Sequence, residues 1–195
     1  MKRSKKIVQE VERQQALLKD KPLKLWFLDE GRFGLKTWLG KILTTVGVKP
    51  IGKSQHRFEN YYLYCLANPA TGVSLFMETP CCNSDFFEAF IKELAESQPD
   101  SNHLIALDNA GFHKAKKLKI PPNILLYFQP PYCPELNPVE RIWEFLKGSL
   151  AGKLPSTLSE LKKMAEKEIK DLTKKRIQSL TQYPYIKNTI ALLQN

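Results

Sequence analysis

The sequence of 195 residues lacks a membrane-spanning segment, a secretion signal and a zinc-binding motif. No stretch approaches the roughly 18 uninterrupted apolar residues of a membrane span. The charged N-terminus has no apolar segment of the kind that a secretion signal needs. Its four cysteines form no CxxC pair and no zinc-type spacing with the three histidines. We therefore expect a cytoplasmic protein with reduced thiols and no membrane attachment.

Acidic residues are missing from two long stretches, although the chain is otherwise well charged. Neither the stretch from Gly31 to Phe58 nor that from Asn109 to Pro134 contains Asp or Glu. The net charge of +10 favours a polyanionic partner, and nucleic acid is the first candidate. A solvated basic face is the alternative. The candidate contacts to a nucleic-acid backbone are Arg32, Lys36, Lys41, Lys53, Arg57, Lys114, Lys116 and Lys117.

The hydrophobic pattern predicts an α/β fold with a mixed five-stranded sheet flanked by helices. Buried strands are expected at 23–30, 103–108 and 123–130, and a hairpin of two strands at 61–78. Helical spacing predicts helices at 84–97, after Pro138 and after Thr157. We expect three parts: a loosely packed basic helix or linker over 1–22, a sheet domain over 23–152, and a helical extension over 153–195 packed on that same domain.

Two aspartates end two of the predicted strands. Asp29 follows the apolar run LKLWFL, and Asp108 follows HLIAL. Ligands of α/β sheets gather at the carboxyl ends of parallel strands, where the loops converge over a crevice. If these two strands are parallel neighbours, the two carboxylates lie side by side.

A third carboxylate, Glu140, lies at the start of a predicted helix and has two interpretations. Asn137 as N-cap, Pro138 at the first position and Glu140 at the third make a capping arrangement worth ~1 kcal/mol, which needs no catalysis. Apolar residues at helical spacing, however, dock this helix firmly on the sheet, so Glu140 can face the same crevice as the aspartates. Glu135 competes for this third position, but it lies in a proline-bounded loop before the helix.

Three carboxylates gathered without a cation would repel one another and raise at least one pKa. Oxygen ligands suit Mg²⁺ or Mn²⁺, and two such ions ~4 Å apart support phosphodiester chemistry. The residues alone therefore favour a metal-dependent site beside a nucleic-acid surface. Glu30 is left out because it points to the opposite side of an extended strand from Asp29.

Three blocks of the sequence resemble the signature blocks of DDE transposases, specifically the bacterial insertion-sequence relatives of the mariner superfamily. The blocks are LWFLDEGRFGL, LIALDNAGFHKAK and QPPYCPELNPVERIWEFLK, in that order. The resemblance implies an RNase H-like catalytic domain with Asp29, Asp108 and Glu140 as catalytic and metal-binding residues. It further implies two Mg²⁺ or Mn²⁺ ions, cleavage at the element's ends, and transfer of the freed 3′ hydroxyl into target DNA, typically at TA. Asn109 and His113 match the second block and are secondary candidates, or residues that organise the turn.

Full-length relatives carry a helix-turn-helix region that reads the terminal repeats, whereas residues 1–22 leave room for only a short basic helix. We therefore expect that the DNA-reading region is encoded in an upstream frame, joined by frameshifting, or lost. We also expect paired protomers when the enzyme is active. The alternatives are a standalone RNase H-like nuclease or resolvase, and a decayed remnant that binds DNA without chemistry.

Overall fold

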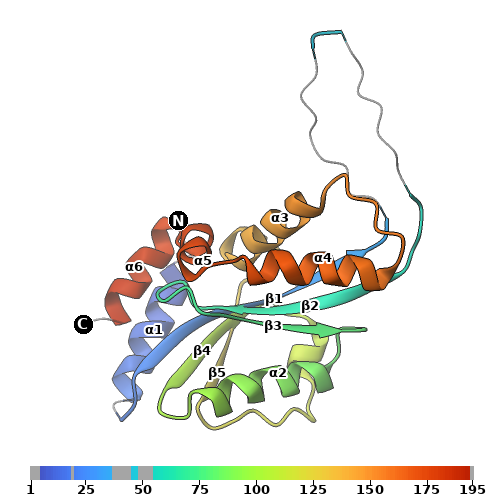
Figure 1. Cartoon of the computed structure of the whole chain (residues 1–195). Helices are drawn as coiled ribbons and strands as arrows, with labels where there is room; N and C mark the ends of the chain where they lie inside the picture. Colours follow the sequence, from blue (N-terminus) through green and yellow to red (C-terminus); the bar gives the residue numbers. More distant parts are fainter. Residues whose placement is uncertain (1–4, 19, 37–44, 48–54, 194–195) are drawn as a thin grey trace.

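The computed structural model describes residues 5–18, 20–36, 45–47 and 55–193. Its core is a five-stranded sheet in the order β3-β2-β1-β4-β5 (Figure 1). The strands are β1 (Leu23–Gly34), β2 (Asn60–Ala67), β3 (Ser74–Thr79), β4 (Asn102–Leu107) and β5 (Ile124–Phe128). β4 is parallel to β1 and β5, while β2 is antiparallel to β1 and β3. The expected mixed sheet is confirmed.

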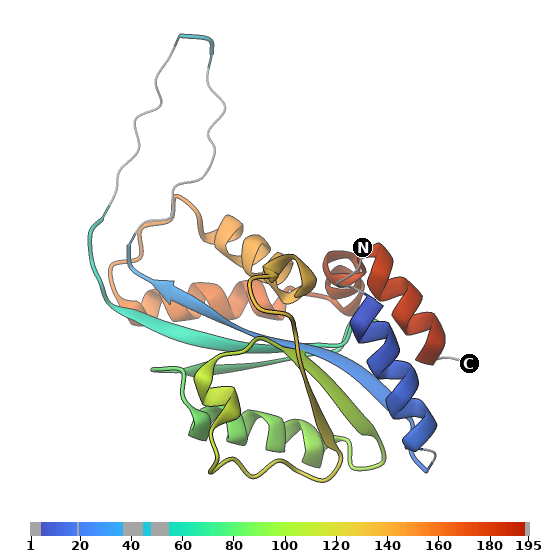
Figure 2. The ribbon, with the colours of Figure 1, turned by 180° about the vertical axis from the view of Figure 1, so that it is seen from behind.

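Helices cover both faces of this sheet (Figures 1 and 2). The six α-helices of the described chain are α1 (Lys5–Leu17), α2 (Ser84–Ser97), α3 (Val139–Leu150), α4 (Leu158–Lys170), α5 (Lys174–Thr181) and α6 (Pro184–Leu193). Short 3₁₀ turns, η1 (Gly111–Lys114) and η2 (Pro134–Leu136), follow β4 and β5. α2 packs on one face, with Phe87 and Ile91 against Trp26 and Leu28 of β1. The remaining helices pack on the other, where alternate β1 side chains such as Phe27 point.

Two details differ from the sequence-based expectations. β1 does not end at its acids but continues to Gly34, because β2 pairs with it as far as Asn60. Asp29 is therefore inside β1, at the level where the parallel neighbour β4 stops. The expectation that residues 1–22 pack loosely is wrong for α1, since Ile7 and Val11 are buried in the main core.

No helix among the described residues has the length and apolar character needed to cross a bilayer.

Candidate active site

Asp29, Asp108 and Glu140 line one pocket of about 450 Å³. Phe27 of β1 pairs with Ala106 of β4 in parallel register. Asp29 and Asp108, each two residues further along its segment, therefore lie next to each other. The predicted neighbourhood of these two aspartates is thus found in the structure. Glu140 reaches the same pocket from the first turn of α3.

The Asp29 carboxylate is partly buried beneath α3. Its Oδ2 accepts a hydrogen bond of 2.8 Å from Nε1 of Trp143. Burial, together with the negative charges of Glu140 and Glu30, raises the pKa of Asp29 to about 8, despite the opposing effect of the Trp143 bond. Ionisation of Asp29 therefore destabilises the folded protein when no cation is bound. The expected repulsion within the acidic group is present at this residue.

A glycine makes room for the Trp143 indole beside Asp29. A Cβ built on Gly31 would lie 2.9 Å from Cδ2 of Trp143 and 2.9 Å from Cε2 of Phe33. Both distances are shorter than real carbon contacts, so a larger residue would displace the indole. Gly31 thus allows the close approach of α3 that brings Trp143 to Asp29.

The side chain of Asn137, which we expected to act only as an N-cap, fixes the start of α3 to β1. Asn137 is buried, and its Nδ2 donates a 2.8 Å hydrogen bond to the backbone oxygen of Leu28, the residue before Asp29. The side-chain Oδ1 of Asn137 accepts a hydrogen bond from the backbone N–H of Val139. The backbone N–H of Asn137 donates to the backbone oxygen of Pro134. The predicted reciprocal cap with Glu140 is replaced by this tertiary contact, and the Glu140 side chain lines the pocket instead.

Replacing Asn137 with alanine is expected to lower the free energy of unfolding by ~1–3 kcal/mol, because the buried Leu28 carbonyl loses its partner. Urea denaturation monitored by tryptophan fluorescence measures the change. Asn188→Ala, at an exposed position of α6, is the matched control and is expected to change stability by less than ~0.5 kcal/mol. Equal losses in the two variants would contradict this role of Asn137.

The Asp108 carboxylate is held by the turn that follows β4. Its Oδ1 accepts a 2.9 Å hydrogen bond from the amide of Ala110. The same oxygen lies 3.0 Å from Nδ1 of His113, although the two atoms are not aligned as a hydrogen bond. Nε2 of His113 lies 3.0 Å from Oε1 of Glu30, which projects from the α2 face of β1. His113 is thus buried between two carboxylates.

These contacts shift the ionisation of all three groups. Burial lowers the pKa of His113, but Asp108 and Glu30 outweigh this and raise it to about 9. The contact with His113 lowers the pKa of Asp108, and burial raises that of Glu30. A protonated His113 therefore supplies a positive charge that keeps Asp108 ionised. Glu30, which we left out of the site, does not line the pocket, but it helps to keep His113 protonated.

Asn109, Lys114 and Lys117 of the second acid-free stretch lie near the pocket or α2. Asn109 lines the pocket, donates to the Gln129 oxygen at 2.5 Å and accepts from Nζ of Lys114 at 2.5 Å. Lys116 is exposed, whereas Lys117 pairs with Asp85 at the start of α2. Lys114 is therefore the basic side chain of this group that is bonded to a pocket residue.

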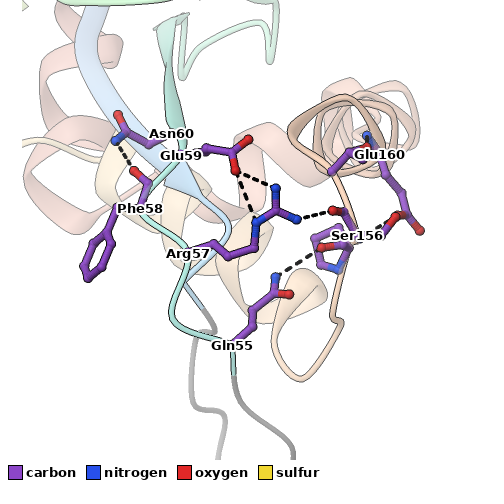
Figure 3. Close-up of polar contacts among 9 residues, drawn as sticks. Gln55, Arg57, Phe58, Glu59, Asn60, Ser156 and Glu160 are labelled. Carbon is purple, nitrogen blue, oxygen red and sulfur yellow. Dashed lines mark hydrogen bonds and ion pairs between the residues drawn. The ribbon is translucent and has the colours of Figure 1, made fainter.

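The first acid-free stretch is described only in part, since Lys41 and Lys53 fall outside the described residues. Arg32, Lys36 and Arg57 line a second pocket of about 330 Å³. Figure 3 shows that the Arg57 guanidinium contacts Glu59 and the backbone oxygen of Ser156. Arg57 thus joins the approach to β2 to the loop before α4, while Arg32 and Lys36 are exposed.

The two other glutamates near α3 lie outside the pocket lining. Glu135 is exposed in η2, and Glu144 is exposed one turn beyond Glu140, where it pairs with Arg141. Glu140 is therefore the glutamate of this segment that shares a pocket with the two aspartates.

Solved structures of known proteins share the fold of this chain. A pre-cleavage Mos1 transpososome matches with a TM-score of 0.65 and 12% identity, over 100% of this chain and 63% of that chain. The Mos1 transposase paired-end complex with left transposon end matches with a TM-score of 0.63 and 14% identity, over 92% of this chain and 57% of that chain. These likenesses support the fold alone, and they confirm the expected RNase H-like architecture.

The sequence comparisons place the chain in a family. Its fold is RNase H-like. The chain belongs to the DDE superfamily endonucleases, whose family model matches residues 24–162. An uncharacterized protein of Sinorhizobium fredii, y4pE/y4sA, is 38% identical over 87 residues, which are 44% of this chain and 64% of that protein. The chain thus spans less than two thirds of the length of these relatives.

Proposed function

We propose that the chain is the catalytic part of a transposase, which cleaves DNA at transposon ends and transfers the freed strand into target DNA. The observation that carries this proposal is the shared pocket of Asp29, Asp108 and Glu140, side chains from β1, the end of β4 and α3. Membership of the DDE superfamily endonucleases supports the same chemistry. In this proposal Asp29, Asp108 and Glu140 are the catalytic residues.

The pocket fits divalent metal ions. Its three charged ligands are carboxylates, the donors that Mg²⁺ and Mn²⁺ prefer. Burial, and after it the negative charges of Glu140 and Glu30, raises the pKa of Asp29, and a bound cation would offset both effects. Two ions would neutralise charge on the attacking and leaving oxygens of an in-line displacement. Mos1 has been solved in paired-end complexes with Mn and with Mg, which supports this choice of metals.

The remaining pocket residues position the carboxylates. Trp143 orients Asp29 through its indole N–H, His113 holds Asp108 from the α2 face, and Asn137 ties α3 to β1. No side chain is required as a nucleophile, because water and then a DNA 3′ hydroxyl attack the phosphorus. The positions of three ligands are thus fixed by three neighbours that are themselves buried.

DNA is the proposed substrate and partner. Arg32, Lys36 and Lys114 are the described basic residues placed to contact its backbone. The Mos1 structures hold paired transposon ends and a strand transfer complex, which supports two protomers in the active assembly. A helix-turn-helix region encoded separately would supply end recognition in this proposal.

Strand joining tests the proposal against a simple nuclease. A duplex that carries the DNA flanking the gene and a free 3′ hydroxyl is incubated with a supercoiled plasmid, the protein and Mg²⁺ or Mn²⁺. Covalent joining of the duplex to the plasmid, with insertions at TA, is the expected result. Nicked plasmid without joining would support a standalone nuclease or resolvase. DNA binding without any cleavage would support a remnant that has lost its chemistry.

A further inference from the structure

One residue of the pocket rim has a conformation and an exposure that the fold itself does not explain. Tyr132 has φ of 58°, the only non-glycine residue with positive φ in the described chain. Its side chain is 97% exposed, so no packing contact compensates for the unfavourable backbone. Glycine, asparagine or aspartate would adopt this conformation more easily. A bulky aromatic at such a position indicates a role outside the folded core.

The loop that carries Tyr132 is held on both sides. Before it, the Gln129 amide donates to the Leu107 oxygen at 2.8 Å, and the Gln129 oxygen accepts from Asn109. After it, the Gln129 side chain donates to the Leu136 oxygen at 2.8 Å, and Cys133 is buried. Prolines at 130, 131 and 134 restrict the backbone further. The exposed ring is thus carried by a braced loop rather than by a free chain end.

Tyr132 also lines the same pocket as Asp29, Asp108 and Glu140. A strand that brings a phosphodiester to these carboxylates must pass the rim on which the ring stands. Without bound metal ions the carboxylates repel phosphates, so attraction near the pocket then has to come from other groups. An exposed aromatic face supplies such attraction to any nucleobase, because every base has a π-face.

On this basis, and resting on the proposed function, we infer that Tyr132 is a stacking platform for a nucleobase next to the reacting phosphate. The base is unpaired or terminal, since a base inside a duplex has no free face. The contact is to the ring rather than to the hydroxyl, so it tolerates different bases and orients the strand more than it reads sequence. Lys114, bonded to Asn109 on the same rim, is placed to contact the adjoining backbone.

Four proteins test this inference: the full chain, Tyr132→Phe, Tyr132→Ala and Tyr132→Asn. Each is titrated into a single-stranded oligonucleotide that carries one 2-aminopurine, in buffer without divalent metal. Stacking quenches 2-aminopurine fluorescence, and anisotropy of a labelled copy gives the affinity. We expect Tyr132→Ala and Tyr132→Asn to weaken binding about tenfold and to lose the quenching, and Tyr132→Phe to stay within about twofold of the wild type.

Tyr132→Asn separates the ring from the backbone. Asparagine tolerates positive φ, so this variant is expected to melt at the same or a higher temperature than the wild type while it binds DNA more weakly. A lower melting temperature together with unchanged binding would assign Tyr132 a structural role and overturn the inference. Wild-type binding and quenching in Tyr132→Ala would also overturn it, with the carboxylate chemistry intact. A wild type that binds no DNA would overturn the proposed function as well.

Discussion

Asp29→Asn, Asp108→Asn and Glu140→Gln are each expected to lower metal-dependent nicking of supercoiled plasmid by at least ~1000-fold. The three carboxylates line one pocket, so each change would remove one anionic ligand from the proposed ion site. A loss of this size corresponds to about 4 kcal/mol in the activation barrier, which is within the several kcal/mol that metal ions supply. Gel separation of supercoiled and nicked plasmid over time, in Mg²⁺ and in Mn²⁺, measures it.

Two glutamates of the same segment are matched controls for this loss. Glu135→Gln and Glu144→Gln change the same functional group at exposed positions outside the pocket lining. Both are expected to nick plasmid at close to the wild-type rate. Full activity in Glu140→Gln with loss in Glu135→Gln would show that the third ligand comes from η2. Equal nicking by the wild type and all the variants would reject the site.

Asp29→Asn is also expected to stabilise the metal-free protein at pH 8, although we expect it to abolish nicking. Folding raises the pKa of Asp29 to about 8 from its ordinary value of 3.8, mainly through burial. Between these values the folded state binds more protons at Asp29 than the unfolded state, so this residue lowers stability as the pH rises. The variant, which keeps an acceptor for Trp143, escapes this loss. We expect its advantage over the wild type to grow by ~2–4 kcal/mol from pH 5 to pH 8.

Urea denaturation with a chelator present, at pH 5 and pH 8, measures this difference. Asp100→Asn, at an exposed position, is the control and is expected to change stability by less than ~0.5 kcal/mol at either pH. Addition of Mg²⁺ or Mn²⁺ at pH 8 is expected to raise the stability of the wild type but not that of Asp29→Asn. An advantage of Asp29→Asn that does not change with pH would contradict the assigned burial of its charge.

The shared pocket was predictable because parallel strands obey a simple geometric rule. Two apolar runs followed by aspartate predicted two strands, and parallel pairing of these strands would place the aspartates side by side. The strands are parallel neighbours, and the register of Phe27 with Ala106 places Asp29 beside Asp108. The apolar stripe of α3 predicted its docking, and Trp143 and its neighbours on that stripe are buried. The helix expected over 84–97 is found as α2 with these bounds, and Asn83 is its N-cap.

The interactions that orient the carboxylates were not predictable, because they join residues far apart in the chain. Asn137 looked like a local cap, yet its side chain bonds the Leu28 backbone across 109 positions of sequence. Trp143 looked like a packing residue, and its bond to Asp29 depends on the space left by Gly31. The strand LKLWFLDE also appeared to end at its acids, whereas β2 extends it to Gly34.

Crystals of the protein soaked in Mn²⁺, with data collected for anomalous scattering, test the central claim most directly. We predict anomalous peaks inside the pocket, within coordinating distance of the Asp29, Asp108 and Glu140 carboxylates, and their loss in Asp29→Asn. Among the described residues, Glu30, Asp108 and His113 form a group of possible ligands whose ligand atoms all lie within 4.8 Å of one another. A peak at that group alone, or a pocket that stays empty at saturating Mn²⁺, would contradict the account.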